Sequence, residues 1–100
     1  MSIFDEKKQL SRFEFRQILR KANFPIPGTG EYYSLEERVR MEKELFPPEK
    51  YGTHISERDF IEVLRELERK KYHQKSYQKQ IEIDRLIRFL KKLSGIEKIW

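Results

Sequence analysis

The feature that most constrains this chain is a thirteen-residue segment that it carries twice. LSRFEFRQILRKA begins at Leu10, and ISERDFIEVLREL begins at Ile55. Both read as an apolar residue, serine, two variable positions, an acid and phenylalanine, followed after two more residues by a β-branched residue and Leu-Arg. We therefore expect two parts of the fold to be built in the same way.

The serine and the acid of each copy predict the start of a helix. In a capping box, a serine side chain accepts a hydrogen bond from the amide three residues later, and the acid there reaches back to the serine amide. Ser11 and Glu14 have this spacing, and Ser56 and Asp59 repeat it with a shorter acid. A third box begins at Ser34, so three helix starts are predicted from caps alone.

The apolar residues of the repeated segment predict which face of each helix is buried. Leu10 and Ile55 precede the serines, where a hydrophobic staple would contact Phe15 and Phe60 four positions into the helix. Further apolar residues follow on a 3.6-residue period, namely Ile18, Leu19 and Ala22 in the first copy and Val63, Leu64 and Leu67 in the second. The segment is thus a helix start with its packing face attached.

Proline and glycine divide the chain into four expected helices. The first runs from about residue 12 to 23 and is followed by a Pro/Gly loop at 24–30. The second begins after Ser34 and is stopped by Pro47-Pro48. The third and fourth cover about 57–72 and 77–93, and the polar stretch between them either breaks the helix or continues it. Gly95 is the expected left-handed cap of the last helix.

These elements predict an all-α protein, a single small helical domain of residues 1–100 with four helices arranged as two helix-loop-helix hairpins. The predicted core positions are Leu35, Val39, Leu45 and Phe46 in the second helix, and Ile83, Leu86, Ile87, Leu90 and Leu93 in the fourth. The loops at 24–30 and 47–53 should lie on the surface, and the tail 96–100 should fold back onto the domain. The two hairpins derive either from a duplicated unit or from separate use of the same helix-start pattern.

Composition excludes several classes of protein. The chain has no cysteine, and therefore neither a disulfide framework nor a thiolate metal site, which fits a reducing compartment. No apolar run approaches the ~18 residues of a membrane span. The N-terminal MSIFDEKKQL turns acidic at once and lacks the apolar core of a signal peptide. We therefore expect a cytoplasmic protein.

Residues 51–60, YGTHISERDF, resemble the exit of an EF-hand, in which glycine, Ile-Ser, an acid and phenylalanine lead into a helix. If Asp59 took the twelfth position of a calcium loop, the first, third and fifth would fall on Pro48, Lys50 and Gly52. None of these has a ligating side chain. What the resemblance implies is a helix-loop-helix with a short strand-like step at His54-Ile55, without calcium.

The sequence predicts no enzyme, no cofactor and no small-molecule ligand. His54 and His73 are nineteen residues apart, without the cysteines or close histidines that a zinc site needs. The serines of the capping boxes already have structural roles, and most carboxylates stand three or four residues from lysine or arginine, as on a solvated helix face. The loop at 24–30 lacks the GK[ST] ending of a phosphate-binding loop.

Positive charge is concentrated in the C-terminal third. Residues 69–92 hold nine Lys and Arg against two acids, a net +7, so the rest of this +5 chain sums to −2. Phosphate contacts come from Lys and Arg, and aromatic rings can stack on bases. We therefore expect a basic, non-catalytic protein that binds DNA or RNA. The predicted phosphate contacts are Lys70, Lys71, Lys75, Lys79, Arg85, Arg88, Lys91 and Lys92, with Tyr72 and Tyr77 as stacking residues.

Two other functions are compatible with the same region. The last helix has a broad apolar face, and Phe89 and Ile81 would be exposed if the core were filled without them. The chain would then be a protein-interaction or assembly module, or a homodimer. An amphipathic basic helix could also adsorb to an anionic membrane surface.

Overall fold

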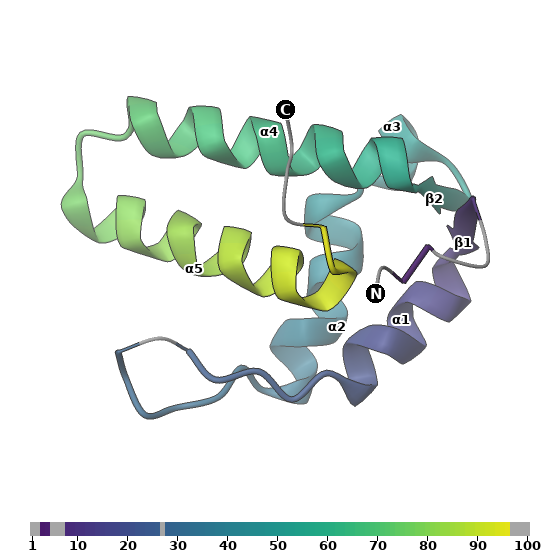
Figure 1. Cartoon of the computed structure of the whole chain (residues 1–100), viewed down its shortest axis with the longest axis horizontal. Coiled ribbons are helices and arrows are strands. Elements are labelled where there is room, and N and C mark those ends of the chain that lie inside the picture. Colours follow the sequence, from purple (N-terminus) through teal and green to yellow (C-terminus); the bar gives the residue numbers. More distant parts are fainter. Residues whose placement is uncertain (1–2, 5–7, 27, 97–100) are drawn as a thin grey trace.

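The computed structural model describes residues 3–4, 8–26 and 28–96, and within them five helices and a two-stranded sheet (Figure 1). In chain order these are β1 (Gln9–Ser11), α1 (Arg12–Lys21), α2 (Leu35–Leu45), α3 (Pro48–Tyr51), β2 (His54–Ser56), α4 (Glu57–His73) and α5 (Tyr77–Ser94). The four expected helices are α1, α2, α4 and α5, and the expected pairs α1/α2 and α4/α5 are each in contact. The all-α, four-helix prediction needs correction, because α3 and the sheet were not foreseen.

The two copies of the repeated segment meet in an antiparallel ribbon. Leu10 of β1 lies opposite Ile55 of β2, and both side chains are buried. The ribbon continues into the first helical turn, where the amide of Arg12 donates to the carbonyl of Thr53 at 3.3 Å. Each strand then leads directly into its helix. The segment occurs twice because two equivalent strand-cap-helix units pair with each other, and the strand-like step at His54-Ile55 is confirmed.

Capping boxes begin three of the helices, as predicted. At α4, the amide of Asp59 donates to Ser56 Oγ at 3.1 Å, and the amide of Ser56 donates to Asp59 Oδ2 at 3.0 Å. The same reciprocal bonds begin α1 at Ser11 and α2 at Ser34. A cap of this kind stabilises a helix by about 1 kcal/mol because it satisfies amides that have no partner within the helix.

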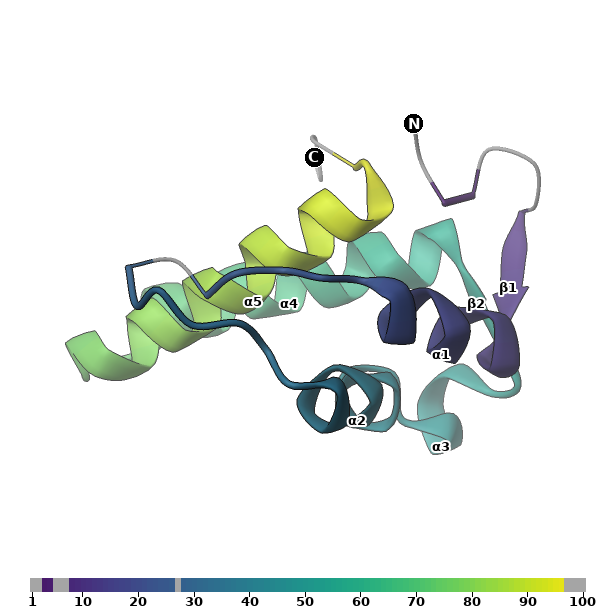
Figure 2. The ribbon, with the colours of Figure 1, turned by 90° about the horizontal axis from the view of Figure 1, so that it is seen from below.

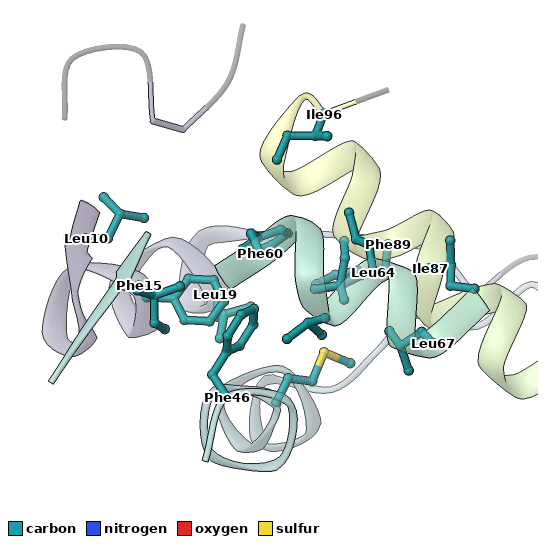
Figure 3. Close-up of a cluster of buried hydrophobic side chains, with 14 of the residues drawn as sticks. Leu10, Phe15, Leu19, Phe46, Phe60, Leu64, Leu67, Ile87, Phe89 and Ile96 are labelled. Atoms are coloured by element: carbon teal, nitrogen blue, oxygen red, sulfur yellow. The ribbon is translucent and has the colours of Figure 1, made fainter. Parts of the chain in front are cut away.

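The phenylalanines of the two segments meet in the core (Figure 3). The rings of Phe15 and Phe60 are edge-to-face with centroids 6.0 Å apart, and Phe46 from the end of α2 lies 5.4 and 5.2 Å from them. All three side chains are fully buried. The predicted core position Leu35 is wrong: it lies in the first turn of α2 and is 52% exposed. Further along α2, Met41 faces the core.

The loop between α1 and α2 runs alongside α5 (Figure 2). Its two arms are joined by a bridge between Pro25 and Tyr32, and the rings of Phe24 and Tyr33 pack edge-to-face on Phe89 at 5.1 and 5.4 Å. Helix α1 ends at Lys21, two residues earlier than expected. The backbone of Ala22 is extended, and this directs the chain towards α5. Phe89 is therefore 0% exposed, and its predicted exposure is wrong.

A short helix occupies the expected loop at 47–53. Pro48 takes the first helical position of α3, where its missing amide hydrogen would have had no partner in any case. Gly52 ends it with φ of 72° and ψ of −152°, a conformation that essentially only glycine adopts. The first, third and fifth positions of the calcium loop thus lie in α3 and its cap, and the twelfth, Asp59, lies in the first turn of α4. The tail 96–100 was expected to fold back onto the domain. Its first residue, Ile96, is buried, and residues 97–100 lie outside the described residues.

A buried ionic cluster joins α1 to α2. Glu42 is 2% exposed and accepts from Arg12 Nη1 at 2.7 Å, with Arg16 Nε at 3.3 Å on its other oxygen. Arg12 Nε also donates to the carbonyl of Gly52 at 2.6 Å. The cluster therefore fixes three segments together, namely both helices and the turn that leads into β2.

Stability should decrease at alkaline pH through groups that hold their protons more tightly when folded. Burial raises the pKa of Tyr33 and Tyr51 above the usual 10.0, and the hydrogen bond to Asp84 raises the pKa of Lys71 above 10.5. A raised folded-state pKa contributes stability that is complete below the unfolded pKa and is lost as pH rises through the folded pKa. We expect urea unfolding free energies to decline above about pH 10. The decline should be shallower in the Tyr33→Phe/Tyr51→Phe variant, and an equal decline would contradict this assignment.

Candidate nucleic-acid interface

The turn between α4 and α5 has a defined structure. Helix α4 ends at His73, Gln74 is extended, and Ser76 caps α5 by accepting from the amide of Lys79 at 3.4 Å. Across the turn, Gln80 Nε2 donates to the carbonyl of Gln74 at 2.7 Å. The stretch 73–76, for which the sequence allowed two outcomes, therefore breaks the helix. The turn lies at the end of the molecule opposite the β1–β2 ribbon (Figure 1).

Five of the predicted site residues gather around this turn, and we call them the hairpin tip: Lys70, Tyr72, Lys75, Tyr77 and Lys79. Tyr72 and Tyr77 are 74% and 77% exposed. The three lysines are also exposed, and their amines make no ion pair with any described residue. No Asp or Glu occurs between residues 69 and 81. The tip therefore holds cations and aromatic rings without an acid in its own segment, and its Lys70 also lines a hollow beside α2 together with Glu44 and Glu66.

Two other predicted residues are paired with a carboxylate. Asp84 on α5 accepts from Lys71 Nζ of α4 at 2.8 Å and from Arg88 Nε at 2.9 Å. The hydrogen bond to Asp84 is the main reason that the pKa of Lys71 is raised. These two cations and Asp84 join the helices of the hairpin, and their charge is partly neutralised.

The remaining three predicted residues lie on α5, and two of them are close to the loop between α1 and α2. Arg85 and Lys91 are half-buried, and the charge of Arg85 acts on the Tyr33 phenol, opposing the effect of burial on the pKa of Tyr33. Lys92 Nζ lies 5.1 Å from the centre of the Phe24 ring. Among the predicted cations of α5, Arg88 is therefore paired with Asp84, and Lys92 lies over an aromatic ring.

A second basic surface, which the sequence analysis missed, lies on the outer face of α4. Arg58, Arg65 and Arg69, together with Ile61 and Glu62, line an open hollow of about 590 Å³. Spacings of seven and four residues place these arginines on one helical face, opposite the buried residues of α4. The same spacing is visible in the sequence and could have identified them.

Neither histidine is part of a polar site. His54 Nδ1 lies 2.9 Å from Thr53 Oγ1 on the surface of β2, and His73 is exposed at the end of α4. Two further hollows, of about 240 and 180 Å³, flank α2, and neither has a serine or histidine among its described lining residues. The described residues include no group of three or more acids and histidines placed to hold a metal ion. None of the described helices is long and apolar enough to cross a membrane.

Comparison with family models, with curated proteins and with solved structures finds no match to this chain. The apolar face of α5 does not offer the patch expected for a protein partner, because Phe89 is buried and Ile81 is half-buried. The hairpin tip is the predicted surface that stays accessible.

Proposed function

We propose that this chain is a non-catalytic nucleic-acid-binding protein that contacts phosphates and bases through the hairpin tip. The observation that supports it most strongly is the exposure of Lys70, Lys75 and Lys79, which form no ion pair with a described residue, in a segment that also carries two exposed tyrosines. Such cations attract phosphates and release their counterions on binding. Tyrosine rings on the same surface offer stacking platforms to bases.

The tip is favoured over the rest of the basic region because its charge is not already engaged. Lys71 and Arg88 would have to leave Asp84 before they could bind a phosphate, and Lys92 would have to leave the Phe24 ring. Among the described residues, Lys70, Lys75 and Lys79 have no ion pair that would have to break first. A positive surface that projects from the molecule also meets a long polyanion without steric conflict from the other elements.

Replacing the three tip lysines should weaken binding and reduce its dependence on salt. In fluorescence anisotropy with a labelled oligonucleotide, three phosphate contacts correspond to a loss of roughly 20- to 40-fold in affinity between ~50 and ~200 mM salt. The variant Lys70→Gln/Lys75→Gln/Lys79→Gln should have a log–log salt slope shallower by about 2 to 3. Because all three side chains are exposed, the variant should unfold at nearly the same urea concentration as wild type.

A matched variant separates local contacts from net charge. Lys8, Lys21 and Lys43 are exposed lysines outside the hairpin, and their replacement by glutamine also lowers the net charge from +5 to +2. This control should keep most of the wild-type affinity for the oligonucleotide and most of its log–log salt slope. Equal losses in both variants, or weak wild-type binding at low salt, would contradict the proposed function.

A further inference from the structure

We infer that the ligand is a single-stranded polynucleotide whose backbone follows the outer face of α4 from the hairpin tip, with a base stacked on Tyr72. This inference rests on the proposed function and adds both the strand class and its path. It follows from the position of the basic surface on the outer face of α4 and from the exposure of the Tyr72 and Tyr77 rings.

The outer face of α4 leads directly to Tyr72. Counting along the helix from Arg58, the arginines fall at positions 0, 7 and 11 and Tyr72 at position 14, which places all four within a narrow sector opposite the core. At 1.5 Å per residue, this row is about 21 Å long, which is enough to contact several nucleotides of a single strand. Within the row, Arg58 and Arg69 are exposed and make no ion pair with a described residue.

The shape of this face suits a flexible backbone better than a rigid duplex. The hollow of about 590 Å³ has cationic walls, and Ile61 supplies an apolar patch within it. Proteins that bind single strands combine a positive groove along the backbone with aromatic rings on which bases stack. In a duplex, the base faces are already stacked on each other, so Tyr72 and Tyr77 would have nothing to stack against.

The opposite choice, a duplex lying along α5, fits the structure less well. A helix that enters a groove needs a continuous cationic face, and on α5 Asp84 precedes Arg85 and forms an ion pair with Arg88 at 2.9 Å. The acid would approach the phosphates together with Arg88. The corresponding face of α4 holds one acid, Glu62, which lies 3.8 Å from Lys50 Nζ and is partly neutralised by it.

The test compares two arginines with two matched cations. Anisotropy titrations use labelled octamers of deoxythymidine and of uridine, which distinguish DNA from RNA, and a duplex of the same length. The variant Arg58→Gln/Arg69→Gln should have a salt slope on the octamers that is shallower by about 1 to 1.5. The control Arg20→Gln/Lys21→Gln removes two exposed charges from α1 and should leave the slope nearly unchanged.

Tyr72 gives an independent readout of stacking. Tyr72→Leu should reduce affinity for the preferred octamer by roughly 5-fold or more, whereas Tyr72→Phe should bind like wild type because the ring is retained. The octamer should also bind more tightly than the duplex. Equal affinity for octamer and duplex, an arginine variant indistinguishable from its control, or equal loss in the Leu and Phe variants would overturn the inference.

The outcome for the inference is separable from that for the proposed function. If the arginine and tyrosine variants behave like wild type while the three-lysine tip variant still loses affinity and salt slope, the tip binds nucleic acid and the path along α4 is wrong. If the tip variant also binds like wild type, both proposals fail together. Circular dichroism and urea unfolding of each variant show that the differences do not come from loss of the fold.

Discussion

Replacing Phe60 by alanine should cost about 3–5 kcal/mol of the free energy of unfolding, the largest effect expected for a single apolar side chain here. Phe60 is fully buried, and its ring centroid lies 5.8, 6.0 and 5.2 Å from those of Phe4, Phe15 and Phe46. Removing the ring leaves a cavity where both halves of the fold meet. The total free energy of unfolding of a small domain is roughly 5–15 kcal/mol, so this substitution would remove a large part of the stability.

Phe13 provides a matched control for this prediction. It carries the same side chain, on the first turn of α1, but is 65% exposed. Phe13→Ala should change the unfolding free energy by no more than about 0.5 kcal/mol. Urea unfolding monitored by circular dichroism measures both variants. Similar losses in the two, or a loss below about 1 kcal/mol for Phe60→Ala, would mean that the phenylalanine cluster is not the centre of the core.

Glu42→Ala should destabilise the protein by a similar amount, about 3–5 kcal/mol, for an electrostatic reason. The carboxylate is 2% exposed and neutralises Arg12, which is itself largely buried and held by the carbonyl of Gly52. Without the acid, the Arg12 charge stays in the interior with no counter-charge. Arg12 Nη2 is already buried without a hydrogen-bond partner among the described residues, so little compensation is available.

A double variant separates two effects, namely the loss of the Arg12–Glu42 ion pair and the cost of leaving one of its charges buried alone. Because replacing both members of a buried ion pair by apolar side chains is often close to neutral, Arg12→Met/Glu42→Met should be more stable than Glu42→Met alone. On the surface, Arg40 pairs with Glu36 at 3.6 Å, and Glu36→Ala should cost less than about 1 kcal/mol. If the double variant were the least stable of the set, the ion pair itself would be a net source of stability.

Much of the helical architecture could be predicted from short-range chemistry. The serines at positions 11, 34 and 56 have their cap partners three residues away, so the signal and the structure it specifies lie within one turn. The ribbon could not be predicted in this way. Leu10 and Ile55 pair across 45 residues, and strands of three residues are too short to show the alternation that identifies a strand. Helix α3 was missed because Pro48 was interpreted as a stop, whereas proline can also begin a helix.

The sequence located the basic residues but not their contacts. The net charge of residues 69–92 pointed to the α4–α5 hairpin, but charge in the sequence does not show which cations are already paired. Asp84 lies thirteen residues from Lys71 and meets it because the hairpin turns between them. Phe89 was expected on the surface because the apolar face of the last helix is broad, but Phe24 and Tyr33 from the loop between α1 and α2 pack on its ring.

The most direct test of the binding surface is a nuclear magnetic resonance titration of the ¹⁵N-labelled protein with a deoxythymidine octamer at low salt. We expect the largest chemical-shift changes in the amides of residues 69–79, and we expect these changes to disappear as salt is added. Shifts concentrated on α2 or on the β1–β2 ribbon, or no shifts at protein concentrations where the octamer is in excess, would show that the hairpin tip is not where this protein binds nucleic acid.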